Sequence, residues 1–502
     1  MPPSTLLALS DASLAIVPAS AVAAGGAEYA LAHTPAGPRL VVVSDPGREA
    51  ILAGFEGERA ERAGRPVLVG PANMPNAAAL RRALPWLVPR PLPPGTSAGF
   101  GDRLGVATPG HVRALRAVGA PIAPIFAQQS VREMTRTGRT PQAVMDDATW
   151  GVFEEGWTAG VGADADHLKT PADIEVCAAA GFSFFTIDPG TYVNDRADSA
   201  GPAELRAAFD ALPWAQLEYH GPSLIAKLAG KVHDFEGHRV QVDEAALVKA
   251  AVKYGLAVAH VVMMFRHLSA VMAGQAFDLE VSVDETESPT SHAEHVYIAS
   301  ELQRLGVRWI SLAPRFVGRF EKGVDYIGDL RAFEADISVH AAIARHFGSY
   351  KLSLHSGSDK FSIYEIAARH ARGAVHLKTA GTSYLEALRA AAQVSPDLFR
   401  AVYAFSRGRY EEDRASYHVS ARLERTPDPG ALAGADLVGL LDQFDVRQVL
   451  HVTFGSVLTT RGVAGTPLFA DAIMALLRSH PDVYAGCLER HFIRHLLPFV
   501  RS

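Results

Sequence analysis

Short β-rich runs alternate with helical segments along most of the chain. From Ser97 onward, eight such runs are each followed by polar residues and then by apolar residues at helical spacing. Strands that alternate with helices predict βαβ units and a parallel sheet, and eight of them predict an α/β fold with a closed (β/α)8 barrel of the TIM type. The eight runs are residues 98–102, 124–128, 161–166, 182–188, 278–284, 308–313, 351–355 and 374–378.

The segments on either side of the predicted barrel follow other patterns. Residues 1–95 are rich in Ala and Pro and end in a cluster of prolines, which predicts an N-terminal α/β subdomain with a buried strand at 39–44. The barrel would then occupy residues 96–400, and residues 401–502 would form a C-terminal extension packed on it. A ninth run at 449–454 leaves two alternatives: it belongs to this extension, or it closes the barrel and the first run lies outside.

Helix-start signals indicate where several strands end. Thr170 is followed by a proline and, three residues later, by an acid, and capping boxes are expected at Ser291 and Ser383. The residues before Thr170 are therefore the carboxyl end of a strand and its loop, which is where barrels place catalytic groups. Asp166 and His167 are adjacent, so both can serve one site only if the strand has already ended.

Alternation within three of the runs gathers polar side chains on one face of each strand. The apolar face of a barrel strand packs against the surrounding helices, so the polar face should point inward. We therefore expect side chains from several strands to meet in one small volume. The members of these polar faces are Glu280, Ser282, Asp284, Ser353, His355, His376 and Lys378.

Three histidines lie near the ends of separate predicted strands, namely His167, His355 and His376. One such histidine is usually a hydrogen-bonded structural group. Three imidazoles desolvated together favour a bound divalent cation, because neutral imidazole is a common ligand for zinc, manganese, nickel and similar ions. The adjacent Asp166 would then be an acid/base group, a solvated carboxylate or a partner that orients a ligating histidine.

Other polar residues are weaker candidates. Arg103 could clamp a carboxylate or form an interior ion pair, and Gln128 could bind hydroxyl groups or cap its strand. His418 and His451 are reserve ligands if the ninth run is a barrel strand. The glycines at 99–105 lack the G-x-G-x-x-G order, so a nicotinamide-binding loop is not supported.

The composition of the chain argues against several classes of protein. The 502 residues carry a net charge of -6, with 48 Lys+Arg interspersed among 54 Asp+Glu, which argues against a nucleic-acid partner. The most apolar run, residues 256–274, contains charged and imidazole side chains, so a membrane partner is not expected. The first 20 residues make a poor signal peptide. Two cysteines, Cys177 and Cys487, exclude a disulfide scaffold, and a cytoplasmic location follows most simply.

Four motifs together resemble the tagaturonate epimerase family of bacterial hexuronate catabolism. They are residues 126–141, 162–170, 354–362 and 376–384, so the resemblance spans about 99–384 of the chain. It implies a divalent-metal enzyme that interconverts D-tagaturonate and D-fructuronate, which are small keto sugar acids. The oligomeric state stays open, and a homo-oligomer is compatible with the sequence.

A looser similarity points to class II metal-dependent aldolases. It implies that Asp166 is an acid/base group beside the metal ligand His167, and that His355 is a second ligand. No motif matches the remaining metal histidine of those aldolases, so His376 is chosen from strand geometry alone.

The implied reaction makes carbon–carbon bond cleavage attractive. The two sugar acids differ at a hydroxyl-bearing carbon β to the ketone, and removing its proton would give a carbanion with no adjacent carbonyl. Cleaving the adjacent bond gives an enediolate and an aldehyde that can rotate before re-addition. We expect this retro-aldol route, with Asp166 and Glu280 as acid/base groups and Asp284 as the substitute for a Glu280 that lies too deep. The expected substrate-binding residues are Lys378, Arg103 and Gln128.

Three other functions fit parts of the pattern. An aldolase would release its two fragments, a redox epimerase would need a bound nicotinamide, and a sugar-acid-binding protein would need no acid/base group. The Asp166–His167 pair argues against the last of these.

Overall fold

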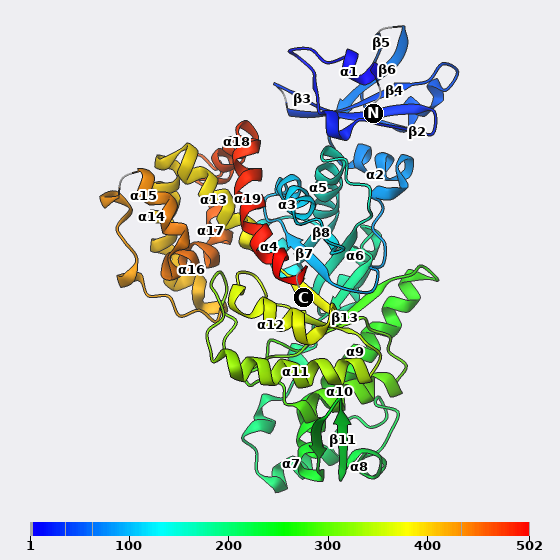
Figure 1. Ribbon diagram of the computed structural model, residues 1–502, viewed down its shortest axis with the longest axis vertical. Coiled ribbons are helices and arrows are strands. Elements are labelled where there is room, and N and C mark those ends of the chain that lie inside the picture. Colours follow the sequence, from blue (N-terminus) through cyan, green and yellow to red (C-terminus); the bar gives the residue numbers. More distant parts are fainter. Residues whose placement is uncertain (1–3, 36, 63, 433, 501–502) are drawn as a thin grey trace.

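The centre of the computed structural model, which describes residues 4–35, 37–62, 64–432 and 434–500, is a closed barrel of eight parallel strands (Figure 1). The strands follow one another around the barrel in the order β10-β13-β14-β15-β16-β7-β8-β9. The predicted (β/α)8 barrel is confirmed, and each predicted run contributes one strand. The strands are β7 (Ser97–Gly101), β8 (Ala123–Ser130), β9 (Gly162–Leu168), β10 (Phe184–Ile187), β13 (Asp278–Ser282), β14 (Ser311–Ala313), β15 (Lys351–Leu354) and β16 (Val375–Lys378).

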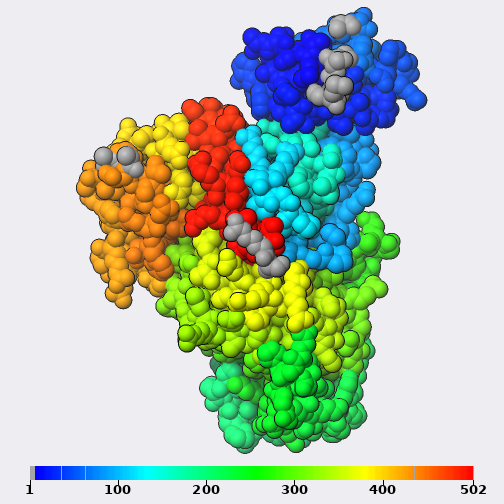
Figure 2. Space-filling view, in the orientation of Figure 1, coloured from blue at the N-terminus to red at the C-terminus, as the bar shows by residue number. Residues whose placement is uncertain are grey.

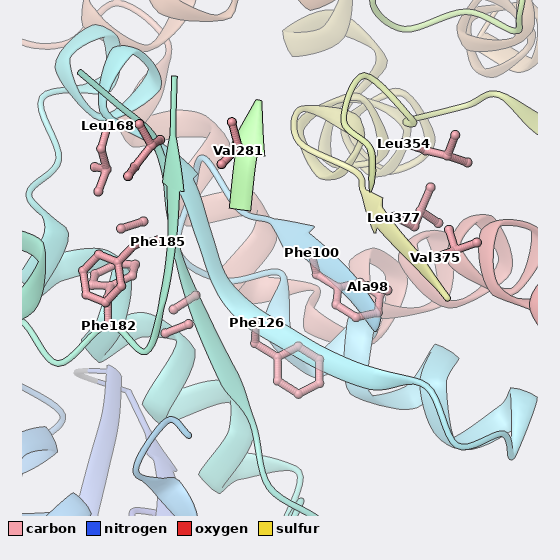
Figure 3. Close-up of a cluster of buried hydrophobic side chains, with 14 of the residues drawn as sticks. Ala98, Phe100, Phe126, Leu168, Phe182, Phe185, Val281, Leu354, Val375 and Leu377 are labelled. Atoms are coloured by element: carbon pink, nitrogen blue, oxygen red, sulfur yellow. The ribbon is translucent and has the colours of Figure 1, made fainter. Parts of the chain in front are cut away.

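Helices alternate with these strands and cover the outside of the barrel. Alternate strand residues such as Phe100, Phe185 and Val281 are fully or almost fully buried, and they belong to the hydrophobic core in which strands and helices meet (Figure 3). The helices are α3 (Thr108–Val118), α4 (Val131–Thr137), α5 (Pro141–Glu154), α6 (Pro171–Ala179), α9 (Glu244–Met272), α10 (His292–Arg304), α11 (Leu330–His346), α12 (Phe361–Ala371) and α13 (Thr382–Val394).

The N-terminal residues form a separate antiparallel sheet of six strands. Its path is β1-β3-β4-β6-β5, with β2 paired to β3. The sheet lies at one end of the molecule (Figure 1 and Figure 2). Helix α2 connects the sheet to the barrel and packs against α5. The elements are α1 (Ser4–Ala8), β1 (Ala15–Ile16), β2 (Val22–Ala24), β3 (Ala27–Thr34), β4 (Gly37–Ser44), β5 (Glu58–Arg62), β6 (Arg65–Pro71) and α2 (Met74–Ala83).

A long insertion follows β10. It comprises α7 (Pro202–Asp210), α8 (Gly221–Leu228) and a hairpin of β11 (Lys231–Phe235) and β12 (His238–Val242), all at the opposite end from the N-terminal sheet (Figure 1). Helix α9 then returns to the barrel wall. By length and composition α9 could cross a membrane, but 83% of its most apolar window is buried inside the protein, as expected for a core helix.

The C-terminal residues are helical. The ninth run at 449–454 lies across the end of one helix and the start of the next, so it belongs to the extension and contributes no barrel strand. The last helix, α19, packs against α3, where Gly110 allows the approach: a Cβ there would lie 2.6 Å from the Cβ of Leu488. The helices are α14 (Pro396–Asp413), α15 (Gly434–Gly439), α16 (Phe444–Val452), α17 (Phe454–Thr459), α18 (Ala470–Ser479) and α19 (Pro481–Leu496).

Two of the three predicted helix starts are confirmed. Thr170 and Ser291 cap α6 and α10 with both hydrogen bonds of a capping box. The third was wrong by two residues, because Gly381 is the cap of α13 and Ser383 lies inside the first turn. The Ser383 hydroxyl instead donates to the carbonyl of Gly101 at 2.7 Å, which joins α13 to the barrel.

Candidate active site

Asp166 and His167 reach the same site through a β-bulge in β9. The register between β9 and β10 shifts here, so that these two residues stand opposite the single residue Thr186. His167 has a φ of +55°, in the left-handed region. The expectation that the strand ends before this pair was wrong, since β9 continues to Leu168. The bulge, rather than a strand end, turns both side chains toward one volume.

The buried ammonium of Lys378 holds three carboxylates together inside the barrel. Its Nζ lies 2.7 Å from Asp166, 2.9 Å from Asp164 and 2.9 Å from Glu280, and it donates to Thr186 at 2.7 Å. Burial alone would lower the pKa of Lys378, but these carboxylates raise it well above its usual value. Its donors are thus occupied by the protein, which differs from the expected role in binding a substrate carboxylate.

His355 lies directly after β15, among carboxylates. Its Nε2 is 3.2 Å from Asp166, and its Nδ1 is 3.4 Å from Glu280 and 3.8 Å from Asp284, yet neither nitrogen makes a hydrogen bond within the described residues. Burial and Lys378 lower the pKa of His355, but Asp284 and Asp166 outweigh them and raise it to about 10. This position therefore attracts a positive charge.

His167 is oriented by a carboxylate that lies behind it. Its Nδ1 is 3.1 Å from Asp188, which also pairs with Lys169 at 3.2 Å, and its ring centroid is 4.3 Å from that of His355. Burial alone would raise the pKa of Asp188, but the hydrogen bond with His167 and the other contacts of the carboxylate together have a larger, opposite effect. The pKa of Asp188 therefore lies well below its usual value. A carboxylate on Nδ1 fixes the ring and leaves Nε2 for a ligand, as is usual for metal-binding histidines.

The structure does not bring His376 into this group. It precedes Lys378 by two residues and so lies roughly 6–7 Å further down the barrel. Its Nδ1 is 2.8 Å from the Ser97 hydroxyl, its ring packs on Phe184, and burial lowers its pKa to about 3. Within the described part of the chain, the metal-type groups whose ligand atoms all lie within 4.8 Å of one another do not include His376. Two of those groups are Asp166–His167–His355 and His167–Asp188–Glu285.

A cavity of about 500 Å³ opens beside His355 at the carboxyl ends of the strands. A smaller space shares the lining residues His355, Lys322 and Tyr417 with this cavity. It also reaches Asp166, His167 and Lys378. Further lining residues are Arg132, Asp284, Glu285, Arg315, Phe316, Arg319, Ser353 and Ser420 in the large space, and Arg103, Gln128 and His451 in the small one.

The two acids predicted to share a face of the run at 278–284 lie at different depths. Glu280 is fully buried and accepts a hydrogen bond from Ser311 at 2.5 Å, so its carboxylate is held within the barrel. Asp284 lines the large cavity and accepts from Ser282 at 2.5 Å. Asp284, two residues beyond the end of β13, is thus the acid of this run that a ligand in the cavity can reach.

Gln128 and Arg103 lie beside the small space. The Gln128 amide donates to Asp166 at 3.3 Å, which helps to fix that carboxylate. Arg103 donates to Glu133 through Nε at 2.8 Å and Nη2 at 2.5 Å and lies over the ring of Phe454. Its remaining nitrogen, Nη1, is buried without a hydrogen-bond partner among the described residues. Arg103 therefore forms the predicted interior ion pair and keeps one nitrogen, Nη1, free of hydrogen bonds to the described residues.

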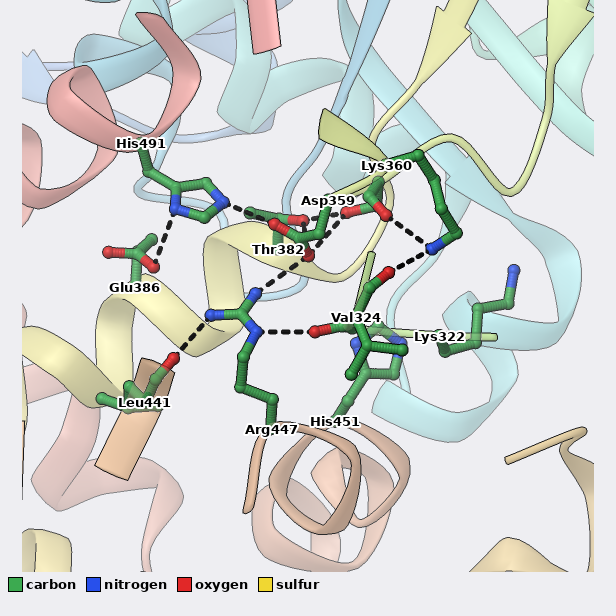
Figure 4. A network of polar contacts seen from close by, with 12 residues as sticks. Lys322, Val324, Asp359, Lys360, Thr382, Glu386, Leu441, Arg447, His451 and His491 are labelled. Atoms are coloured by element: carbon green, nitrogen blue, oxygen red, sulfur yellow. Dashed lines mark hydrogen bonds and ion pairs between the residues drawn. The ribbon is translucent and has the colours of Figure 1, made fainter. Parts of the chain in front are cut away.

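Asp359 ties the loop that follows His355 to the C-terminal helices (Figure 4). Its carboxylate lies 2.9 Å from Arg447 of α16 and 2.7 Å from His491 of α19, and its N–H donates to His495 at 3.0 Å. Asp359 has a φ of +61°, and although burial raises its pKa, Arg447 and His491 lower it to well below its usual value. The extension thus fixes the backbone next to His355.

The same network holds the loop that carries Lys322 (Figure 4). Arg447 donates to the carbonyl of Gly323 at 2.6 Å, and the buried ammonium of Lys360 donates to that of Glu321 at 2.8 Å. Burial lowers the pKa of Lys360 to about 7. Lys322 is therefore fixed by hydrogen bonds on both sides of it in the chain.

Several of these residues were not anticipated from the sequence. Asp188 ends a predicted strand, so an acid at the carboxyl end of a strand was a usable signal. Lys322 lies in an irregular loop, and Tyr417 and Arg447 lie in the extension, where no periodic pattern marks them.

Comparison with known proteins places the chain among enzymes. A family model described as tagaturonate epimerase matches residues 19–498. The chain belongs to the tagaturonate epimerase family. Membership confirms the resemblance seen in the sequence, and it makes the chain a carbohydrate epimerase, an isomerase. The match extends into the N-terminal sheet, which carries no recognised motif.

Individual relatives of this epimerase match along almost the whole chain. A tagaturonate/fructuronate epimerase of Thermotoga maritima is 43% identical over 457 residues, which cover 91% of each chain. The native crystal structure of a fructuronate-tagaturonate epimerase from Cohnella laeviribosi is 36% identical, with a TM-score of 0.90, and the match covers 97% of this chain and 96% of that one.

Asp359→Asn should destabilise the epimerase by about 3–5 kcal/mol, because Arg447 is left as a buried charge without its partner. In an Arg447→Met background the same replacement should cost clearly less. Urea or thermal unfolding of the wild type, both single variants and the double variant measures this coupling. Equal losses in both backgrounds would show that the ion pair does not hold the loop.

Proposed function

We propose that this epimerase interconverts D-tagaturonate and D-fructuronate by retro-aldol cleavage and re-addition, with a divalent cation bound at the carboxyl ends of the barrel strands. The observation that carries the proposal is the convergence of Asp166, His167 and His355 around one small space, where His355 also lines a cavity of about 500 Å³. The relatives named for this pair of keto sugar acids support the choice of substrate. Two free, buried cysteines fit a reducing compartment such as the cytoplasm.

The residues present fit a divalent cation such as zinc, manganese or nickel. His355 is buried with no hydrogen bond at either ring nitrogen, and Asp188 leaves the Nε2 of His167 available. His167 and His355 would hold the cation, whereas His376 lies too deep to be kept as the third ligand. A cation bound there supplies Lewis-acid stabilisation of negative charge on the substrate.

Asp166 is the group that takes the proton of the β-hydroxyl. Lys378 and Gln128 fix its carboxylate, and Lys378 keeps it ionised. As the C–C bond breaks, its electron pair moves toward the ketone to give an enediolate, and the hydroxyl carbon becomes an aldehyde. The aldehyde rotates, and re-addition on its other face forms the bond again and gives the opposite configuration.

Asp284 returns a proton to the new alkoxide from the opposite side. It replaces Glu280 in this role because Glu280 is fully buried against Ser311 and Lys378, away from the cavity. The carboxylates of Asp166 and Asp284 lie on either side of His355, within 3.2 Å and 3.8 Å of its ring nitrogens. A rotating aldehyde would therefore meet one acid/base group on each face.

Lys322 and the free Nη1 of Arg103 bind the substrate carboxylate. Both residues line the small space, and Lys322 also lines the large cavity. The Lys322 ammonium donates to Ser356 at 3.0 Å and forms no ion pair with a described carboxylate. Lys378 has no such freedom, because its donors are taken up by the protein.

Asp166→Asn should keep the bound cation but lose epimerisation by about 10²–10⁴-fold, the usual contribution of a general base. Metal analysis and a tagaturonate/fructuronate interconversion assay check both halves. The wild type, treated with a chelator and then reloaded, serves as the control that links the cation to turnover. Normal turnover in the variant would remove Asp166 from this role, and loss of the cation would make Asp166 a ligand instead.

Lys322→Gln should weaken turnover of the keto sugar acids by about 10–100-fold through KM, because it removes one charge-assisted hydrogen bond worth about 1.5–3 kcal/mol. Arg319→Gln is a matched control, since Arg319 lines the same cavity but is largely exposed and lies 3.5 Å from Glu321. Steady-state kinetics of both variants decide the point. An equal loss in both would argue against a specific carboxylate contact at Lys322.

A further inference from the structure

A second group of metal-ligand type lies outside the barrel, between α10 and α11. His292 is the first residue of α10, and Asp336 and His340 lie four residues apart on α11, on one face of that helix. The Oδ1 of Asp336 is 3.2 Å from the Nε2 of His292 and 3.5 Å from the Nε2 of His340. The three atoms all lie within 4.8 Å of one another, and none of these residues lines the cavity of the barrel.

One ring nitrogen of His340 contacts a second histidine, and the other ring nitrogen makes no hydrogen bond to the described residues. Its Nδ1 is 2.8 Å from the Nδ1 of His295, and the Nε2 of His295 is 2.6 Å from the Tyr350 hydroxyl. The remaining Nε2 of His340 is fully buried and has no hydrogen-bond partner among the described residues. A buried imidazole nitrogen that faces a carboxylate but makes no hydrogen bond is available to coordinate a cation.

The proton arrangement in this chain of rings can supply a lone pair at that nitrogen. If Nδ1–H of His340 donates to His295, then His295 donates through Nε2–H to Tyr350, and the Nε2 of His340 is bare. The opposite arrangement, with Tyr350 as the first donor, places a proton on that Nε2 beside Asp336.

Asp336 is fixed for coordination through its other oxygen. Its Oδ2 accepts a hydrogen bond from the Val317 N–H at 3.1 Å, which leaves Oδ1 toward the two histidines. Four-coordinate zinc with bonds of about 2.0–2.1 Å separates its ligand atoms by roughly 3.4 Å. The 3.2 Å hydrogen bond between His292 and Asp336, which a cation would replace, and the 3.5 Å separation from His340 are close to that spacing. The side chain of His292 is one-third exposed, which gives solvent ions access.

We propose that His292, Asp336 and His340 bind a divalent cation of the zinc type, separate from the barrel site. The loop between β14 and α11 contacts two of these ligands. The Val317 N–H donates to Asp336, and the Phe316 ring packs edge-on against His340, with the ring centroids 5.5 Å apart. Phe316, Arg315 and Lys322 of this loop line the active-site cavity. The cation is therefore structural, and its ligands are positioning residues for the cavity wall.

Zinc content of the full-length enzyme after equilibration with Zn²⁺ and removal of the excess tests the site. We expect His292→Ala to lower the zinc content by one equivalent in both the wild-type and the His355→Ala background. In the second background the barrel site is already disabled, so failure of the proposed barrel metal cannot hide or mimic the result. Zinc should also raise the unfolding temperature of His355→Ala but not that of His292→Ala/His355→Ala.

His267→Ala is the matched control, because His267 is also about one-third exposed and lies 3.1 Å from a carboxylate, that of Glu175, but belongs to none of the groups of three metal-type ligands in the described chain. It should lose no zinc. The proposal is overturned if His292→Ala binds as much zinc as its parent, or if His267→Ala loses as much as His292→Ala does. His340→Gln, which keeps a polar group of similar size, should repeat the loss if His292→Ala folds poorly.

Discussion

One buried ammonium, that of Lys378, holds the centre of this epimerase together. Asp164, Asp166 and Glu280 come from two strands and would repel one another inside the barrel, where charges cost several kcal/mol each unless they are paired. One positive charge does not balance three carboxylates, and burial together with its neighbours raises the pKa of Asp164 to about 7. The excess of negative charge continues at His355, where the carboxylates of Asp284 and Asp166 outweigh burial and Lys378 and raise the pKa of the imidazole. This excess of negative charge supports the proposal of a divalent cation at the ends of the strands.

The positions of the reactive groups depend on parts of the chain far from them in sequence. The bulge in β9 turns Asp166 and His167 to one side, and the C-terminal helices hold the loop after His355 through Asp359 and Arg447. A barrel alone would leave that loop and the Lys322 loop without these supports. The extension is therefore part of the active site in a physical sense, since it fixes the walls into which the strands deliver their side chains.

The sequence predicts most of the fold and about half of the residues of the candidate site. Alternation within the strands predicts which side chains point inward, but it does not give depth, so His376 and Glu280 were expected at the level of His355 and lie below it. A bulge shifts the alternation by one residue and leaves no mark in the pattern. The run at 449–454 was ambiguous because a short apolar stretch suits a buried helix as well as a strand. Lys322 and Asp359 depend on contacts between distant loops, which periodicity cannot reveal.

The fate of one hydrogen decides between cleavage of a carbon–carbon bond and removal of a proton. During interconversion in D₂O, retro-aldol cleavage and re-addition leave the hydrogen on the epimerised carbon in place, because only oxygen-bound protons pass through Asp166 and Asp284. Mass spectrometry and NMR of the product should therefore show no deuterium at that carbon. One deuterium gained there per turnover would contradict the assignment of these carboxylates to a carbon–carbon bond-breaking site.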